Sequence, residues 1–110
     1  MTPNKWEIWM VNMPFDEGIG SKVRPALVID STGICILVGK MISHAPRREF
    51  PYEYPMIDWA GAGLQCPTTI RLSKITQLDK SRFLKRIGVI QTADQMRVRE
   101  ILTKIRSGSK

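Results

Sequence analysis

Lys22 and Arg24 stand where a glycine-bearing loop enters an apolar run of the chain, and this juncture is the clearest candidate for chemistry in the sequence. Pro25 fixes its own φ and disfavours a helical backbone at Arg24, so the guanidinium is held where flexible chain meets rigid structure. Arginine offers a planar fork of donors that matches a phosphate and keeps its charge at any working pH. The juncture therefore predicts a phosphate site.

Three further side chains could share this site. Arg71 lies in a β-branched stretch at 68–72, although a lone arginine on a strand more often faces solvent. Ser43 and His44 end another predicted strand; a hydroxyl can bond a phosphate oxygen, and histidine titrates near neutrality. Adjacent residues on a regular strand face opposite sides, so both reach one site only if the strand breaks, which Pro46 favours. A loop histidine without chemistry is the alternative for His44.

Aromatic residues beside basic ones could stack on unpaired bases, which is how single-stranded RNA is usually bound. They concentrate in the long, proline-rich segment 44–55, whose length favours a functional role. Ordinary packing is the alternative; it is the better interpretation for Trp59, and we expect it for Trp6 and Trp9. The candidates for stacking are Phe15, Phe50, Tyr52 and Trp59.

Charge and composition favour a polyanionic partner. Among 110 residues there are 17 Lys and Arg and 10 Asp and Glu, a formal net charge of +7. A merely basic, well-solvated surface is the alternative. Hydrophobic residues make up 43% and charged residues 25%, which is typical of a globular protein, and the length suits one domain over 1–110.

The sequence favours neither a metal site nor a cofactor. There is one histidine, Cys35 and Cys66 belong to no CxxC pair, and no phosphate-loop or dinucleotide fingerprint occurs. We expect both cysteines to be buried, reduced thiols. There is no signal-peptide pattern, and no apolar stretch approaches the ~18 residues that span a membrane. We therefore expect a cytoplasmic protein that does not enter a membrane.

The elements that must position these residues are mostly strands, because the apolar runs are short and β-branched. The first run, 5–13, is apolar on both faces, which favours a central strand. We expect strands at 5–13, 24–29, 34–38, 54–58, 68–72 and 87–90, with a tight turn at 30–33 and a helical turn at 81–85.

The C-terminal segment predicts a helix with one apolar stripe. The stripe consists of Val98, Ile101, Leu102 and Ile105. Thr92 and Gln95 have the spacing of a capping box, Asp94 adds negative charge to the first turn, and Gly108 follows the end. Five or six strands and one terminal helix predict a mainly β fold, a small antiparallel barrel closed over that helix.

Two strings, in this order and at this separation, resemble the MazF/PemK toxins of bacterial toxin–antitoxin systems. They are Arg-Pro-Ala-Leu-Val-Ile at 24–29 and Leu-Asp-Lys-Ser-Arg at 78–82. Shorter matches lie at 7–11, 41–43, 67–72 and 87–88, so the resemblance covers nearly the whole chain. It implies an SH3-like barrel and a homodimer with RNA bound across the dimer interface.

The resemblance also implies sequence-specific, metal-independent cleavage of single-stranded mRNA, leaving a 2′,3′-cyclic phosphate and a 5′-hydroxyl. The family's main catalytic residues match Arg24 and Ser43, and a further arginine of some members matches Arg71. Arg24 is then expected to stabilise charge on the phosphorane. A cognate antitoxin with an acidic, initially disordered segment would fold over the same basic surface, and operator DNA would be bound only through that complex.

The chain departs from the family at two positions. Gly18 and Ile19 stand where some members have a His or Glu, and Ser73 stands where others have an Asp. The general base is therefore not inherited by motif, and His44 is our hypothesis for proton transfer. We expect the RNA contacts to come from Phe15, Gly20, Ser21, Lys22, Arg47, Arg48, Tyr52 and Ser73.

Two alternatives remain open. A non-catalytic nucleic-acid binder on the same barrel would bind RNA in a salt-dependent way without cutting it. A protein-interaction module would bind an acidic antitoxin-like peptide and have little affinity for RNA.

Overall fold

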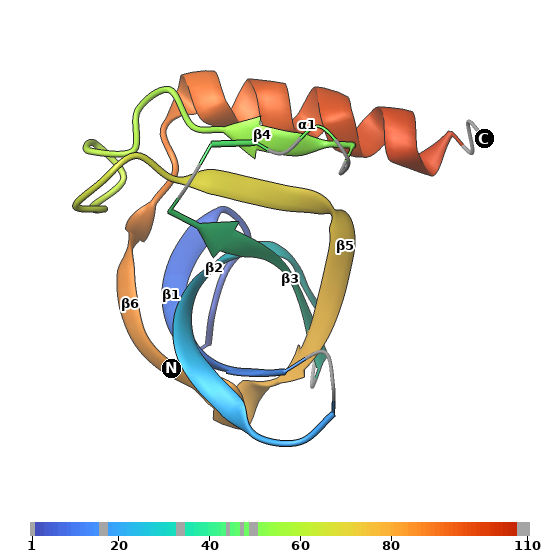
Figure 1. The fold of residues 1–110 in the computed structure, drawn as a ribbon. Helices are drawn as coiled ribbons and strands as arrows, with labels where there is room; N and C mark the ends of the chain where they lie inside the picture. The colour runs from blue at the N-terminus through green and yellow to red at the C-terminus, as the bar shows by residue number, and fades with distance from the viewer. Residues whose placement is uncertain are drawn as a thin grey trace.

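The computed structural model describes residues 2–15, 18–32, 35–43, 45–46, 48 and 51–107, and of Thr32 and Cys35 the backbone only. These residues form strands, one 3-10 turn and one helix (Figure 1). In chain order they are β1 (Glu7–Pro14), β2 (Ser21–Thr32), β3 (Cys35–Ile42), β4 (Glu53–Pro55), β5 (Thr69–Asp79), η1 (Lys80–Arg82), β6 (Phe83–Val89) and α1 (Thr92–Arg106). The predictions for Gly108 and for the side chain of Cys35 lie outside the described part.

The strands make one antiparallel sheet in the order β4-β5-β3-β2-β1-β6. Figure 1 shows the sheet curling strongly round, with α1 lying beside β4 across one end. The predicted mainly β fold with a C-terminal helix is confirmed. The prediction that the sheet closes into a barrel is wrong. In the sheet of the described residues, β4 and β6 are edge strands with one neighbour each.

A bulge in β5 explains how a strand longer than predicted follows the curved sheet. Gly39 of β3 lies opposite Ile75, yet the next residue, Lys40, lies opposite Arg71, so residues 72–74 are extra on β5. Extra residues bend a strand and increase its twist, and β5 turns a corner in Figure 1. The bend lets β5 pair with both halves of β3 and still run on to Asp79.

Both faces of the sheet are buried over much of its area. In β1 the consecutive residues Ile8 and Trp9, which point to opposite faces, are both buried, as the apolar character of this run predicts. One face, here the Trp9 face, carries the cluster Trp9, Val11, Met13, Ala26, Val28, Ile36, Val38 and Leu78. The other, here the Ile8 face, packs with the loops and α1 in the cluster Ile8, Leu27, Ile29, Met41, Tyr54, Met56, Ala62, Ile70, Leu72, Ile90 and Val98.

The predicted packing roles are confirmed. Trp9 is buried on its face, and Trp6 and Trp59 pack partly buried against the Ile8-face cluster. The helical stripe faces the same cluster, with Val98 fully buried and its other members partly buried. Amphipathic spacing therefore locates the helix and its inner side correctly.

Several predicted boundaries are wrong. The turn placed at 30–33 belongs mostly to β2, because residues 30–32 pair with residues 35–37 of β3. The helical turn lies earlier, at Lys80–Arg82. The capping box is absent: Gln91 is the N-cap residue, without a side-chain cap hydrogen bond, and Gln95 Nε2 instead donates to the Ile90 carbonyl at 2.7 Å. Polar side chains near a helix start have such competing partners, which spacing alone does not show.

Asp94 is completely buried and joins α1 to β4. Its Oδ1 accepts hydrogen bonds from the Tyr54 hydroxyl at 2.5 Å and the Ile57 amide at 2.8 Å, and its Oδ2 accepts one from the Asp58 amide at 2.9 Å. Burial, and then the hydrogen bond and charge of Asp94, raise the pKa of Tyr54 strongly, so its hydroxyl remains a donor. The carboxylate predicted to serve the helix dipole thus connects helix, strand and loop.

We predict that Tyr54→Phe destabilises the fold by about 1–3 kcal/mol at pH 7, because a buried carboxylate oxygen loses its donor. The raised pKa keeps the contribution complete below the unfolded-state value near 10, and it declines only as the pH rises further. Urea unfolding at pH 7 and 9 measures the effect. Tyr52→Phe, at an exposed neighbouring position, is the control; equal stability of the two variants would contradict the role of Asp94.

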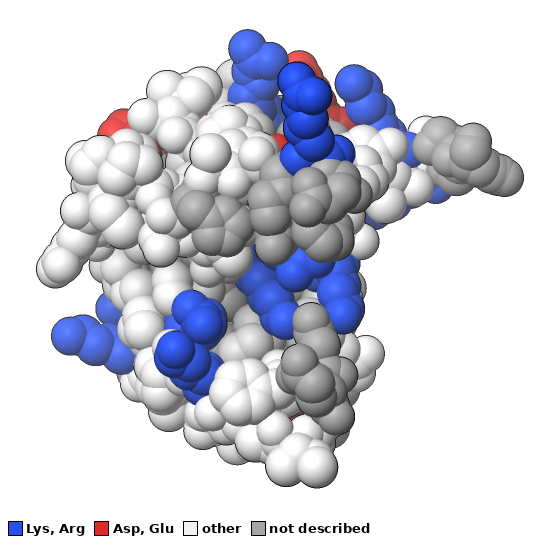
Figure 2. All heavy atoms as spheres, viewed as in Figure 1, with Lys and Arg blue, Asp and Glu red and all other residues white. Residues whose placement is uncertain are grey.

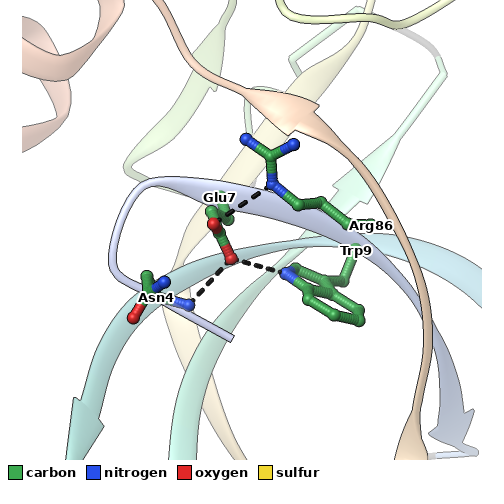
Figure 3. Close-up of polar contacts among 4 residues, drawn as sticks. All are labelled: Asn4, Glu7, Trp9 and Arg86. Atoms are coloured by element: carbon green, nitrogen blue, oxygen red, sulfur yellow. Dashed lines mark hydrogen bonds and ion pairs between the residues drawn. The ribbon is translucent and has the colours of Figure 1, made fainter. Parts of the chain in front are cut away.

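Glu7 forms a second polar centre, between β1 and β6 (Figure 3). Its Oε1 accepts hydrogen bonds from Trp9 Nε1 at 2.8 Å and the Asn4 amide at 2.9 Å, and its Oε2 accepts one from Arg86 Nε at 3.1 Å. Partial burial raises the pKa of Glu7, but the hydrogen bonds from Trp9, Asn4 and Arg86 outweigh it, so the net shift is downward.

We predict that Glu7→Gln costs about 1 kcal/mol of stability at pH 7. Because the folded-state pKa of Glu7 is lowered, its contribution is present above the unfolded value near 4.5 and is lost as the pH falls through the folded value. The difference between wild type and variant should therefore shrink from pH 7 to pH 3 in thermal unfolding. Glu100→Gln, at an exposed helix position, should show no such trend; a difference independent of pH would refute the assignment.

Candidate phosphate site on the sheet

A cavity of about 350 Å³ opens between the start of β2 and the end of β3. None of the described residues that line it is acidic, and four are cations. The lining consists of Met13, Pro14, Phe15, Lys22, Arg24, Lys40, Met41, Ile42, Ser43 and Arg71. Residues separated by up to 56 positions in the chain thus lie around one space: Phe15, Lys22, Arg24, Ser43 and Arg71.

Strand register explains why the cations meet. Residues directly opposite in an antiparallel pair share a face, and Ala26, Lys40 and Arg71 lie opposite one another across β2, β3 and β5. Arg24 and Lys22 precede Ala26 by two and four residues on the same strand, so they point to that face as well. All four cations therefore belong to the Trp9 face, where Arg24 and Lys22 lie opposite Val11 and Met13 of its apolar cluster.

A tight turn fixes the loop that leads into β2. The Phe15 amide donates to the Gly20 carbonyl at 3.1 Å, and the Gly18 amide donates to the Phe15 carbonyl at 3.0 Å. Gly20 has φ of 86°, and a Cβ there would lie 3.2 Å from the Phe15 ring. Glycine at this position therefore serves the turn and seats the ring at the cavity, while Ser21 donates to Asn12 Oδ1 at 3.0 Å and is not among the lining residues.

Arg71 is a mostly buried cation with a defined ion-pair partner. Its Nε lies 3.4 Å from Glu53 Oε2, in an ion pair whose side chains are 15% and 1% exposed, respectively. Glu53 lies directly opposite Arg71, across the β4–β5 pair. The expectation that a lone arginine on a strand faces solvent is therefore wrong for Arg71.

Sequence reasoning missed two residues of this region, Glu53 and Lys40. Lys40 shares the parity of Ile42 on β3, so alternation along an extended strand could have indicated its face. Glu53 carries no such signal, because its position depends on the short strand β4 and on its register with β5.

Other predicted contact residues do not line the cavity. Arg48, Tyr52 and Ser73 are described and exposed, and Ser73 lies in the bulge of β5. His44, Arg47 and Phe50 lie outside the described residues, so the site roles predicted for them stay predictions.

Two further cavities continue from the first, and Ser43 lines all three. A narrow one of about 120 Å³ adds Leu64 and Gln65 next to Arg24. A wider one of about 350 Å³ is mostly apolar, with three prolines and Met56 in its wall. Cys66 lines both additional cavities and is an exposed free thiol, so the prediction that it is buried is wrong: it lies in a loop between β4 and β5, not in a strand.

The charge distribution suits an extended anion. On the face of the molecule seen in Figure 2, Lys and Arg side chains gather towards the middle and few Asp or Glu side chains are visible. Within the described ranges, no three His, Cys, Asp or Glu side chains form a group that could hold a metal ion. No helix in the same part of the chain has both the length and the apolar character needed to cross a membrane.

Residues 4–106 match the family model of the PemK-like, MazF-like toxins of type II toxin–antitoxin systems. Because the match covers most of the sequence, the chain belongs to this toxin family. A search of curated protein sequences finds no significant match.

Solved structures with the same fold include toxins of this kind. An endoribonuclease in complex with its cognate antitoxin, from a Mycobacterial species, has a TM-score of 0.74 at 12% identity, over 98% of both chains. MazF from Deinococcus radiodurans has a TM-score of 0.72 at 20% identity, over 97% of this chain and 98% of that one. The toxin MazF-mt6 of Mycobacterium tuberculosis has a TM-score of 0.67 at 16% identity, over 90% and 96%. At these identities, the likeness establishes the fold.

We predict that Arg24→Gln weakens binding of a single-stranded oligonucleotide and reduces the slope of log K against log salt by about 0.7, the value for one phosphate contact on a single strand. Fluorescence anisotropy over a salt series measures both. Arg106→Gln removes the same charge at the end of α1, outside the cavity lining, and is the control. An unchanged slope for Arg24→Gln would exclude Arg24 from phosphate contact.

Proposed function

We propose that this chain, as a single toxin domain over 1–110, is an endoribonuclease that cuts single-stranded mRNA at specific sequences without a metal ion. The observation that carries the proposal is the cavity in which Arg24, Ser43 and Arg71 come together. The family membership and the described activity of structural neighbours support the same class of reaction.

In the proposed reaction, the ribose 2′-oxygen attacks the adjacent phosphorus and displaces the 5′-oxygen. The products are a 2′,3′-cyclic phosphate and a 5′-hydroxyl; the 2′-hydroxyl loses its proton to a base, and the departing oxygen gains one. The protein needs no nucleophile of its own, so its task is to bind the phosphate and to stabilise the charge that develops on the phosphorane.

The lining residues suit this task. Arg24 and Arg71 offer guanidinium forks to the non-bridging oxygens, the Ser43 hydroxyl donates to one of them, and Lys22 and Lys40 add positive charge. The half-exposed ring of Phe15 offers a surface for base stacking beside the phosphate. His44 remains our hypothesis for the proton transfer.

The proposal extends to the partners. We infer a homodimer, an acidic cognate antitoxin that covers the basic face, contact with operator DNA only through that complex, and a cytoplasmic location. The antitoxin is supported by the neighbouring endoribonuclease that is described in complex with its own antitoxin. Charge complementarity gives the physical reason, because the basic face attracts an acidic segment as it attracts RNA.

The test is incubation of purified protein with a long single-stranded RNA in excess EDTA. We predict discrete fragments that end in cyclic phosphate, and a loss of roughly 10²–10³-fold in rate for Arg24→Ala, the usual effect of removing one electrostatic donor. Arg106→Ala is the matched control and should cleave like the wild type.

Three results would contradict all or part of the proposal. RNA that remains intact despite salt-sensitive binding would favour a non-catalytic binder, and intact RNA without binding would favour a protein-interaction module. Cleavage that EDTA abolishes would overturn metal independence alone.

A further inference from the structure

We propose that Glu53 is a positioning residue that holds the Arg71 guanidinium towards the cavity. The contact of β4 with Asp94 holds this strand in place, and with it the ion pair. The inference rests on the proposed function, because it assigns a residue to the same site.

The first step is the burial of a carboxylate at a cationic site. The Glu53 side chain is 1% exposed, and its Oε2 lies 3.4 Å from Arg71 Nε. Burying a carboxylate is costly unless a cation and hydrogen bonds compensate, so the buried Glu53 carboxylate favours a conformation in which Arg71 stays beside it. Glu53 is not among the residues that line the cavity, whereas Arg71 is. The carboxylate therefore acts on a ligand through Arg71.

The second step is geometric. Glu53 and Arg71 lie opposite each other on the Trp9 face, and the contact is made through Nε. An ion pair at this buried nitrogen favours one placement of the planar guanidinium and so directs its terminal nitrogens. An arginine with a flexible side chain loses conformational entropy when it binds a phosphate. A guanidinium that is already oriented loses less of it on binding.

The third step connects β4 to the helix. Tyr54 follows Glu53 and lies opposite Ile70, on the Ile8 face, where its hydroxyl donates to Asp94. Successive side chains of a strand point to opposite faces, so a three-residue strand presents one residue to the helix and the preceding one to the site. β4 is an edge strand with β5 as its neighbour, and the Asp94 contact fixes its other side.

The charge of Glu53 makes a positioning role distinguishable from a purely structural one, because the two roles predict different effects on RNA affinity. A carboxylate beside Arg71 reduces the positive potential that attracts a phosphate. Removing the charge should therefore leave the affinity for RNA unchanged or increase it, while the misplaced guanidinium lowers the rate of cleavage. A residue that only stabilised the fold would lower both.

The kinetic test uses Glu53→Gln, Glu53→Asp and the charge-matched control Glu100→Gln. We expect Glu53→Gln to lower kcat roughly 10- to 100-fold, as small misplacements of a reacting group do, without weakening the binding of RNA that carries 2′-deoxyribose at the cut. Glu53→Asp keeps the charge and should recover part of the rate, and Glu100→Gln should behave as wild type. Weaker binding together with slower cleavage for Glu53→Gln would overturn the proposal.

Combining variants separates positioning from direct catalysis. If Glu53 acts through Arg71, Glu53→Gln should change kcat by less than about twofold in an Arg71→Gln background. If Glu53→Gln lowered kcat as strongly in that background as in the wild type, Glu53 would act independently of Arg71, and the inference would be overturned.

A spectroscopic test does not depend on RNA cleavage. In NMR spectra of the protein without RNA, the Nε–Hε signal of Arg71, assigned by its loss in Arg71→Lys, should exchange with water at least roughly tenfold faster in Glu53→Gln than in wild type or Glu100→Gln. The buried Nε should reach water more often once the ion pair no longer holds it in place. An unchanged exchange rate refutes positioning even if the protein cuts RNA. Conversely, faster exchange in a protein that cuts no RNA would support the ion pair and refute the proposed function.

Discussion

The buried carboxylate of Asp94 is the contact on which the arrangement of this sheet depends. β4 has only three residues and pairs with one strand, so its own ladder holds it weakly. Asp94 supplies what the ladder lacks, by accepting three hydrogen bonds from Tyr54 and from the two amides that follow β4 closely. A buried acceptor that lost these donors would bear its full desolvation cost, so helix, strand and loop are stable only together.

Placing four cations on one face is costly for folding, and the structure limits that cost in two ways. Lys22 and Arg24 are exposed, where water screens their charges. Arg71 is mostly buried and has Glu53 as a counter-ion. The site is therefore divided into an outer pair that can attract a polyanion from a distance and an inner arginine that the protein orients before the ligand arrives. Such preorganisation is worth more to a charged transition state than additional mobile charge.

The sequence predicts those parts of this fold that depend on short-range pattern. Short, β-branched apolar runs located the strands, the stripe from Val98 located α1, and the juncture at Lys22 and Arg24 located one wall of the cavity. Closure was predicted wrongly, and the role of Asp94 and the Glu53–Arg71 pair were not predicted, because each depends on how distant segments pair and pack. The bulge in β5 is decisive here: if the register of Gly39 and Ile75 continued without a shift, Lys40 would lie opposite Lys74 in place of Arg71. No local pattern in the sequence marks that shift.

The bulge also explains how a curved sheet brings separate surfaces to one site. It bends β5 so that its first half, with Arg71, reaches the cavity while its second half continues in the pairing with β3. The loop between β4 and β5 is then free to line the neighbouring cavities with Gln65 and Cys66. Cations and apolar walls thus lie side by side along connected cavities, which is the arrangement that a flexible chain of phosphates and bases requires. Curvature of the sheet, more than any single side chain, brings the two kinds of surface together.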